Sequence, residues 1–88
     1  MFAYSETSRE KIITLFFTLE DVAGILSDIL RVLASFGANV LTINQNIPVN
    51  GIANITVSFR TDLEGIDDIV DGLYGIEGIN QIDVLAME

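Results

Sequence analysis

Residues 11–26 read KIITLFFTLEDVAGIL, an apolar strand pattern that passes within a few residues into a helical one. Over residues 11–18, apolar side chains occupy both sides of the alternation, since Ile13, Leu15 and Phe17 fall on one side and Ile12 and Phe16 on the other, with Thr14 and Thr18. Apolar residues on both sides are typical of a central strand. The stretch therefore predicts a strand at the middle of a sheet.

The run after Asp21 predicts a helix over about residues 23–36. Apolar residues recur there at helical spacing, and polar residues fill the rest of the wheel. Gly37 ends the pattern, and glycine readily takes the left-handed conformation that closes many helices. The apolar positions are Leu26, Ile29, Leu30, Leu33 and Phe36.

Two alternating segments follow, residues 39–47 and 52–60, and they predict a hairpin. Pairing Ile43 with Val57, and Asn44 with Thr56, keeps both apolar sets on one face, which requires an odd number of loop residues. This parity favours a three-residue loop, 49–51, with Gly51 left-handed, over a two-residue Asn-Gly turn. The expected inward residues are Leu41, Ile43 and Ile47, then Ala53, Ile55, Val57 and Phe59.

A second helix is predicted over residues 65–74, ending near Gly75, and a fourth strand over residues 79–87 with Ile82, Val84 and Ala86 on one side. The order βαββαβ predicts an α+β, ferredoxin-like sandwich, a four-stranded antiparallel sheet with both helices on one face. We expect residues 1–10 to be a polar lead-in and residues 11–88 to be one domain.

Composition narrows the classes of function. The chain has no cysteine, which fits a cytoplasmic protein, and no apolar run of the length that spans a membrane. Its net charge is -9, so binding to nucleic acid or to an anionic membrane surface is disfavoured. With no histidine and no cysteine, triad and zinc catalysis are excluded, and we expect no enzyme activity, no metal and no cofactor. Asp67 and Asp71 are interpreted as a solvated helix face.

One segment has the features of a binding site: Leu19 to Leu26, where the first strand gives way to the first helix. The first N–H groups of a helix lack partners within the helix and carry the positive end of its dipole, so they can receive a carboxylate. Gly24 leaves that approach open. The alternative is structural, with Asp21 serving only as the N-cap and Gly24 only in packing.

Asp21-Val22-Ala23-Gly24-Ile25-Leu26 resembles the first loop of the ACT domain family, and the likeness continues through Gly37-Ala38-Asn39-Val40 and covers about residues 11–87. Over EKIITLFFTLED and LTINQNIPVNGIANITVS the chain is most similar to small bacterial ACT proteins linked by name to phenylalanine synthesis or chorismate mutase. Those relatives carry an additional N-terminal segment that resembles a helix-turn-helix, so we expect this chain to correspond to the C-terminal ACT part.

The resemblance implies a regulatory module that binds a free amino acid between the first loop of one subunit and the second strand of a neighbour, and thereby controls amino-acid metabolism. An apolar ligand is favoured, because no basic residue lies near the loop. Two departures concern the ligand: Ala23 replaces a frequent proline, and Leu19 stands where serine-binding members often have histidine. The candidate ligand-binding residues are Glu20, Asp21, Val22, Ala23, Gly24, Ile25, Leu26, Asn44 and Asn46.

Two other functions remain open at this point, a ligand-free dimerisation module that serves a partner protein and, third, a chorismate mutase-type enzyme. We expect the chain to form a homo-oligomer, most simply a dimer. Helices on one face leave the other face of the sheet open, and Ile12 and Phe16 would present an apolar patch there.

Overall fold

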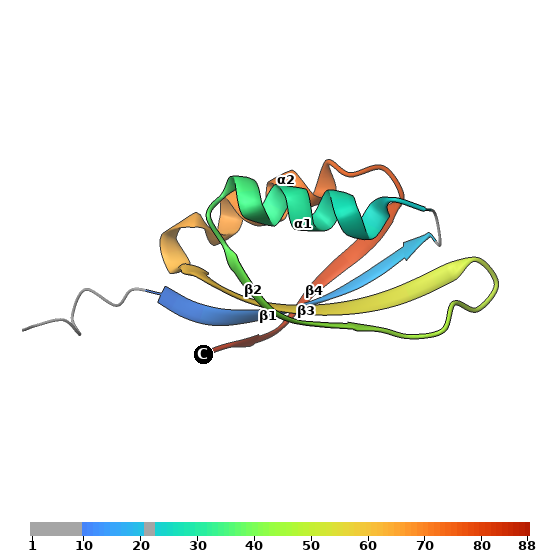
Figure 1. Ribbon diagram of the computed structural model, residues 1–88, viewed down its shortest axis with the longest axis horizontal. Coiled ribbons are helices and arrows are strands. Elements are labelled where there is room, and N and C mark those ends of the chain that lie inside the picture. The colour runs from blue at the N-terminus through green and yellow to red at the C-terminus, as the bar shows by residue number, and fades with distance from the viewer. Residues whose placement is uncertain (1–9, 21–22) are drawn as a thin grey trace, which may run out of the picture.

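The predicted central strand lies in the middle of the sheet. The computed structural model describes residues 10–20 and 23–88, and in these ranges the sheet order is β2-β3-β1-β4 with every neighbouring pair antiparallel. Both helices cover one face of the sheet (Figure 1), which confirms the ferredoxin-like βαββαβ fold. The elements are β1 (Glu10–Glu20), α1 (Ile25–Ser35), β2 (Asn39–Gln45), β3 (Ile52–Asp62), the short 3-10 helix η2 (Leu63–Gly65), α2 (Ile66–Tyr74) and β4 (Ile79–Met87).

The core lies between the helices and the inner face of β1 and β3. Every inward residue predicted for these two strands is buried, and helices α1 and α2 supply the opposing layer. Fully burying one such side chain stabilises the fold by about 1.5–3 kcal/mol. The buried set is Ile13, Leu15, Phe17, Leu19, Ala53, Ile55, Val57 and Phe59 from the sheet, with Ile25, Ile29, Leu33, Ile69 and Leu73 from the helices.

The predicted hairpin register is confirmed, but the predicted three-residue loop is wrong. Ile43 pairs with Val57, and Gly51 is left-handed with φ 78°. However, Val49 and Ile52 exchange two backbone hydrogen bonds of 2.9 and 3.0 Å around Asn50 and Gly51, and Asn50 also has positive φ, at 54°. Two consecutive positive φ values make a two-residue type I′ turn, the form that suits the strand twist.

The odd number of connecting residues that the facing of the two strands requires comes from one additional residue elsewhere in the hairpin. Between the pairs Gln45–Ile55 and Val49–Ile52 the chain takes four steps on one side and three on the other. The additional residue therefore lies within residues 46–48, where β2 has already ended.

Strand β2 is more exposed than the predicted half-buried strand. The register shifts between Val40 and Thr42, so Val40 packs against the core while Leu41 is exposed, contrary to prediction. Ile47, also expected to face inward, is 87% exposed beyond the end of the strand. Because β2 is an edge strand, even the correctly oriented Ile43 is covered from one side only.

Strand β4 has the predicted bounds but two register shifts. Ile82 and Val84 lie opposite Phe17 and Leu15, as expected, but only Ile82 packs against the core, since Val84 is 48% exposed. Leu85 is the additional residue of one shift, so Ala86 pairs with Thr14 and not with a core residue of β1. The predicted placement of Ala86 beside Ile82 and Val84 is therefore wrong.

The open face of the sheet is mixed in character. Ile12 and Phe16 are half-buried and alternate with the inward set of β1, as predicted. Their cross-strand neighbours are polar, since Phe16 lies between Thr56 and Asp83 and Ile12 lies opposite Arg60. Thr14 Oγ1 and Ser58 Oγ are hydrogen-bonded at 2.9 Å between them. Ile12 and Phe16 are thus apolar positions separated by polar neighbours, and the oligomer inferred from them stays a prediction.

Candidate functional site

The candidate site lies where β1 ends and α1 begins. Gly24 is the N-cap of α1, left-handed with φ 95°, and its carbonyl accepts the first hydrogen bond of the helix from the Asp28 N–H at 2.9 Å. Asp21 is therefore not the N-cap, because the helix begins later than that reading requires. Asp21 and Val22 themselves lie outside the described residues.

The loop residues divide into exposed and buried ones. Ala23 and Gly24 are exposed, and Glu20, the last residue of β1, is exposed as well. Ile25 is only 4% exposed, and Leu26 is partly buried against the core. Among the described residues of this loop, Glu20, Ala23 and Gly24 form the surface, and in the single copy Ile25 lies beneath it, so its contact with a ligand stays a prediction.

Gly78, a residue that the sequence interpretation missed, holds this loop from the other side. It precedes β4, its carbonyl accepts the Glu20 N–H at 2.9 Å, and it has φ 102°. A Cβ at this position would lie 2.6 Å from Ile25 Cδ1. Only a glycine fits without displacement, so Gly78 fixes both the end of β1 and the buried side chain at the start of α1. The sole signal in the sequence is a glycine shortly before a strand.

Asn44 and Asn46 are not brought to the loop within one chain. Asn44 lies opposite Thr56, which itself lies opposite Phe16, so this row belongs to the open face of the sheet. The helices and the start of α1 lie on the other face (Figure 1). Asn46 follows the end of β2, where its N–H donates to the Asn54 carbonyl at 3.0 Å. The candidate residues therefore form two separate groups in a single copy.

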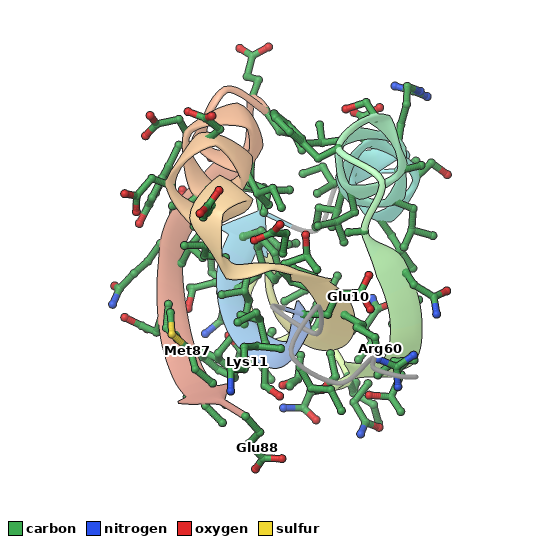
Figure 2. The ribbon with its side chains drawn as sticks, turned by 90° about the vertical axis from the view of Figure 1, so that its left-hand side faces the viewer. Glu10, Lys11, Arg60, Met87 and Glu88 are labelled. Atoms are coloured by element: carbon green, nitrogen blue, oxygen red, sulfur yellow. The ribbon has the colours of Figure 1, made fainter. Side chains whose placement is uncertain are left out.

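The cationic side chains that the structure describes are distant from the loop or paired. Lys11 and Arg60 lie at the end of the sheet where β1 begins (Figure 2), and the ten residues from Lys11 to Glu20 place the loop about 30 Å away. Arg31 lies on α1 but pairs with Asp28, with 2.7 Å between Nη1 and Oδ1. A ligand at the loop would meet helix amides and carboxylates.

The part of the chain that the structure describes holds no group of three potential metal ligands, and no enclosed pocket is found in the single copy. Among the same residues, no helix has the length and apolar character needed to cross a membrane.

Comparison with known proteins places these observations in a family. The family model of the ACT domain matches residues 13–73. The UPF0735 ACT domain-containing protein of Acetivibrio thermocellus is 48% identical over 90 residues, covering 100% of this chain and 61% of that protein. A UPF0735 ACT domain-containing protein of Desulfitobacterium hafniense is also 48% identical over 90 residues, covering 98% of this chain and 59% of that protein. The chain thus spans about three fifths of the length of these relatives, and neither name mentions phenylalanine synthesis or chorismate mutase.

Solved structures support the fold. The ACT domain from the GTP pyrophosphokinase of Chlorobium tepidum superposes with a TM-score of 0.71 at 22% identity, over 86% of this chain and 99% of that one. The acetolactate synthase small subunit from Thermotoga maritima gives a TM-score of 0.71 at 14% identity, over 83% of this chain and 46% of that one. TM-scores of this size establish a shared fold, and at identities this low they establish the fold alone.

Proposed function

This chain belongs to the ACT domain family, and we propose that it is a non-catalytic module that binds a free amino acid and thereby regulates amino-acid metabolism. In this proposal it acts in the cytoplasm, as the C-terminal part of a protein of the relatives' length. The observation that carries the proposal is the start of α1, where the left-handed Gly24 and the small Ala23 leave the helix N-terminus exposed.

The chemistry of that helix start suits an amino acid. N–H groups of the first turn have no partners within the helix and lie at the positive end of its dipole, which favours a ligand carboxylate. Asp21, between the last residue of β1 and the N-cap, supplies a carboxylate for the ligand ammonium, with Glu20 as a less favourably placed substitute. Both charges of a free amino acid would then be met within one loop.

A second copy would complete the site. Strand β2 is an edge strand, and the sequence between Arg31 and Arg60 holds no charged residue. An edge without charges is unprotected against pairing with another strand, and two chains of net charge -9 repel each other least where neither is charged. Pairing through β2 is the arrangement that sets strand β2 of one copy beside the loop of the other, as the resemblance implies. Asn44 lies on the open face of its own sheet, so Asn46, beyond the end of β2, is the residue proposed to reach the loop and close a pocket that a single copy does not form.

The ligand class follows from the missing cations. With Lys11 and Arg60 distant and Arg31 paired to Asp28, an acidic side chain would find no compensating charge among the described residues. An apolar amino acid would lie beside Val22 and Ala23. Phenylalanine is the first ligand to test, since the resemblance includes proteins linked by name to its synthesis.

Thermal unfolding measured with each of the twenty amino acids should separate ligand from non-ligand. A ligand at ten times its dissociation constant stabilises the folded state by about 1.4 kcal/mol, which for a domain of this size raises Tm by roughly 5–10 °C. We expect such a shift with an apolar amino acid and none with aspartate or glutamate. If no amino acid raised Tm at millimolar concentration, the proposal that this domain binds a free amino acid would be contradicted.

The second candidate function, a dimerisation module without ligand, is favoured by the absence of an enclosed pocket in the described single copy. It predicts a dimer in sedimentation and no shift with any amino acid. A chorismate mutase-type activity predicts prephenate formation, which a direct assay measures and which we do not expect.

The proposed interface can be tested with a charge placed on each edge of the sheet. Ile43→Lys introduces one charge per copy at a 40% exposed position of the edge strand β2, on the side that faces the helices, so the two copies carry like charges at the interface, and we expect the dimer to weaken at least roughly tenfold, equivalent to about 1.4 kcal/mol. Asn80→Lys makes a comparable change on the exposed surface of β4 and is the control. Sedimentation equilibrium measures both. Equal effects of the two variants, or a monomeric wild type, would exclude this interface.

A further inference from the structure

The outer edge of β4 differs from that of β2 in having two register shifts, where β2 has one, and a tyrosine hydroxyl bonded to its backbone. Between its two register shifts, β4 keeps a regular ladder with β1 only over residues 81–84. Irregularities of this kind turn an edge away from an approaching strand. This segment is the longest part of β4 with an uninterrupted register.

Tyr74, the last residue of α2, occupies the middle of that segment. The Ile82 N–H donates to Tyr74 Oη at 3.0 Å, and the Tyr74 hydroxyl donates to the Ile82 carbonyl at 3.3 Å. In an antiparallel ladder, the N–H and C=O of one residue point to the same side of the strand. One phenolic oxygen thus satisfies both backbone groups that Ile82 directs away from β1. The Tyr74 side chain is 48% exposed, so it lies at the surface where a new strand would have to pair.

We propose that Tyr74 is an edge plug, which prevents a second copy of this chain from adding its β2 strand to β4. The charges on the two edges indicate which strand would otherwise pair with β4. Strand β4 carries Asp83, and the neighbouring α2 carries Asp67, Asp68 and Asp71, so two acidic β4 edges repel each other. The uncharged β2 edge is the partner that meets least repulsion there.

The consequence of the plug is a closed assembly. Pairing of β2 with β2 uses the same surface on both copies and stops at a dimer, whereas pairing of β2 with β4 joins different surfaces and continues without end. Tyr74 leaves only the first mode. This inference goes beyond the proposed function, because it requires no ligand.

Tyr74→Phe removes the hydroxyl and keeps the ring. We expect its weight-average mass in sedimentation to exceed that of the wild type at least twofold at high micromolar concentration and to rise with concentration. Tyr74→Phe combined with Ile43→Glu should return to small species, because a carboxylate on β2 is repelled by the acidic β4 edge. A Tyr74→Phe protein with the size distribution of the wild type would overturn the proposal, whether the wild type is a monomer or a dimer.

Hydrogen exchange gives a readout that does not depend on variant assembly. In the dilute wild type, the Ile82 amide should exchange at least tenfold more slowly than the Val84 amide, which the same register directs to the same edge and for which Tyr74 is not the partner. In dilute Tyr74→Phe the two rates should converge, while core amides of β1 keep their protection. Equal rates for Ile82 and Val84 in the wild type would show that the hydroxyl does not hold this edge.

Discussion

Replacing Gly78 by alanine should lower the free energy of unfolding by about 2–4 kcal/mol. Two costs add at this position. The backbone has φ 102°, which a residue with a Cβ adopts only under strain, and the new Cβ would lie 2.6 Å from Ile25 Cδ1 in the core. Urea unfolding followed by circular dichroism measures the change through the transition midpoint and slope.

Matched variants separate the two costs. Gly37→Ala has the same kind of strain, with φ 77°, but no atom within 4 Å of its Cβ, so it should cost only about 1–2 kcal/mol. Ile25→Val removes the methyl group that Gly78→Ala would meet, so the double variant should lose less than the sum of the two single variants. Equal effects of Gly78→Ala and Gly37→Ala would show that the contact with Ile25 is unimportant.

The second large effect concerns binding. Asp21→Asn should weaken the affinity for the amino-acid ligand about tenfold to a hundredfold, because it removes the carboxylate proposed to meet the ligand ammonium, and a charged hydrogen bond contributes about 1.5–3 kcal/mol. The fold should be little affected, since Gly24 and not Asp21 caps α1. Calorimetric titration, with unfolding measured alongside, gives both quantities.

Glu20→Gln is the matched control for this variant. Glu20 is the exposed last residue of β1, one position before Asp21, and its structural hydrogen bond to Gly78 uses the backbone N–H. The control should therefore retain both the fold and most of the affinity. If Glu20→Gln and Asp21→Asn weakened binding equally, the effect would come from net charge and not from a specific contact.

The elements of the fold could be predicted because local patterns and the global fold agree in most of this chain. Ile13, Leu15 and Phe17 recur at every second position of β1, and both helices carry a regular apolar stripe. The spacing of apolar residues alone therefore identifies these three elements. The errors came from single additional residues. Parity shows that one is needed in the hairpin, but it does not distinguish residues 46–48 from the turn itself, and it gives no warning of the shift at Leu85.

At the candidate site, the sequence allowed only the backbone to be predicted. The Gly24 motif correctly indicated an open helix start, but the depth of Ile25 and the role of Gly78 depend on a contact between segments more than fifty residues apart. Asn44 and Asn46 were joined to the loop by resemblance, and one copy does not bring them together. Their contribution remains a prediction about an assembly.

The strand order β2-β3-β1-β4 also determines when this domain can fold during its synthesis. Strand β1 is made first, yet its two neighbours, β3 and β4, are made after β2 and α2 respectively, so the central strand waits for the last nine residues of the fold. Only the β2–β3 hairpin closes locally. Chains dominated by such distant pairings fold slowly, and an apolar strand that waits unpaired is exposed to aggregation. The nascent domain therefore remains incomplete on the ribosome until β4 has left the exit tunnel.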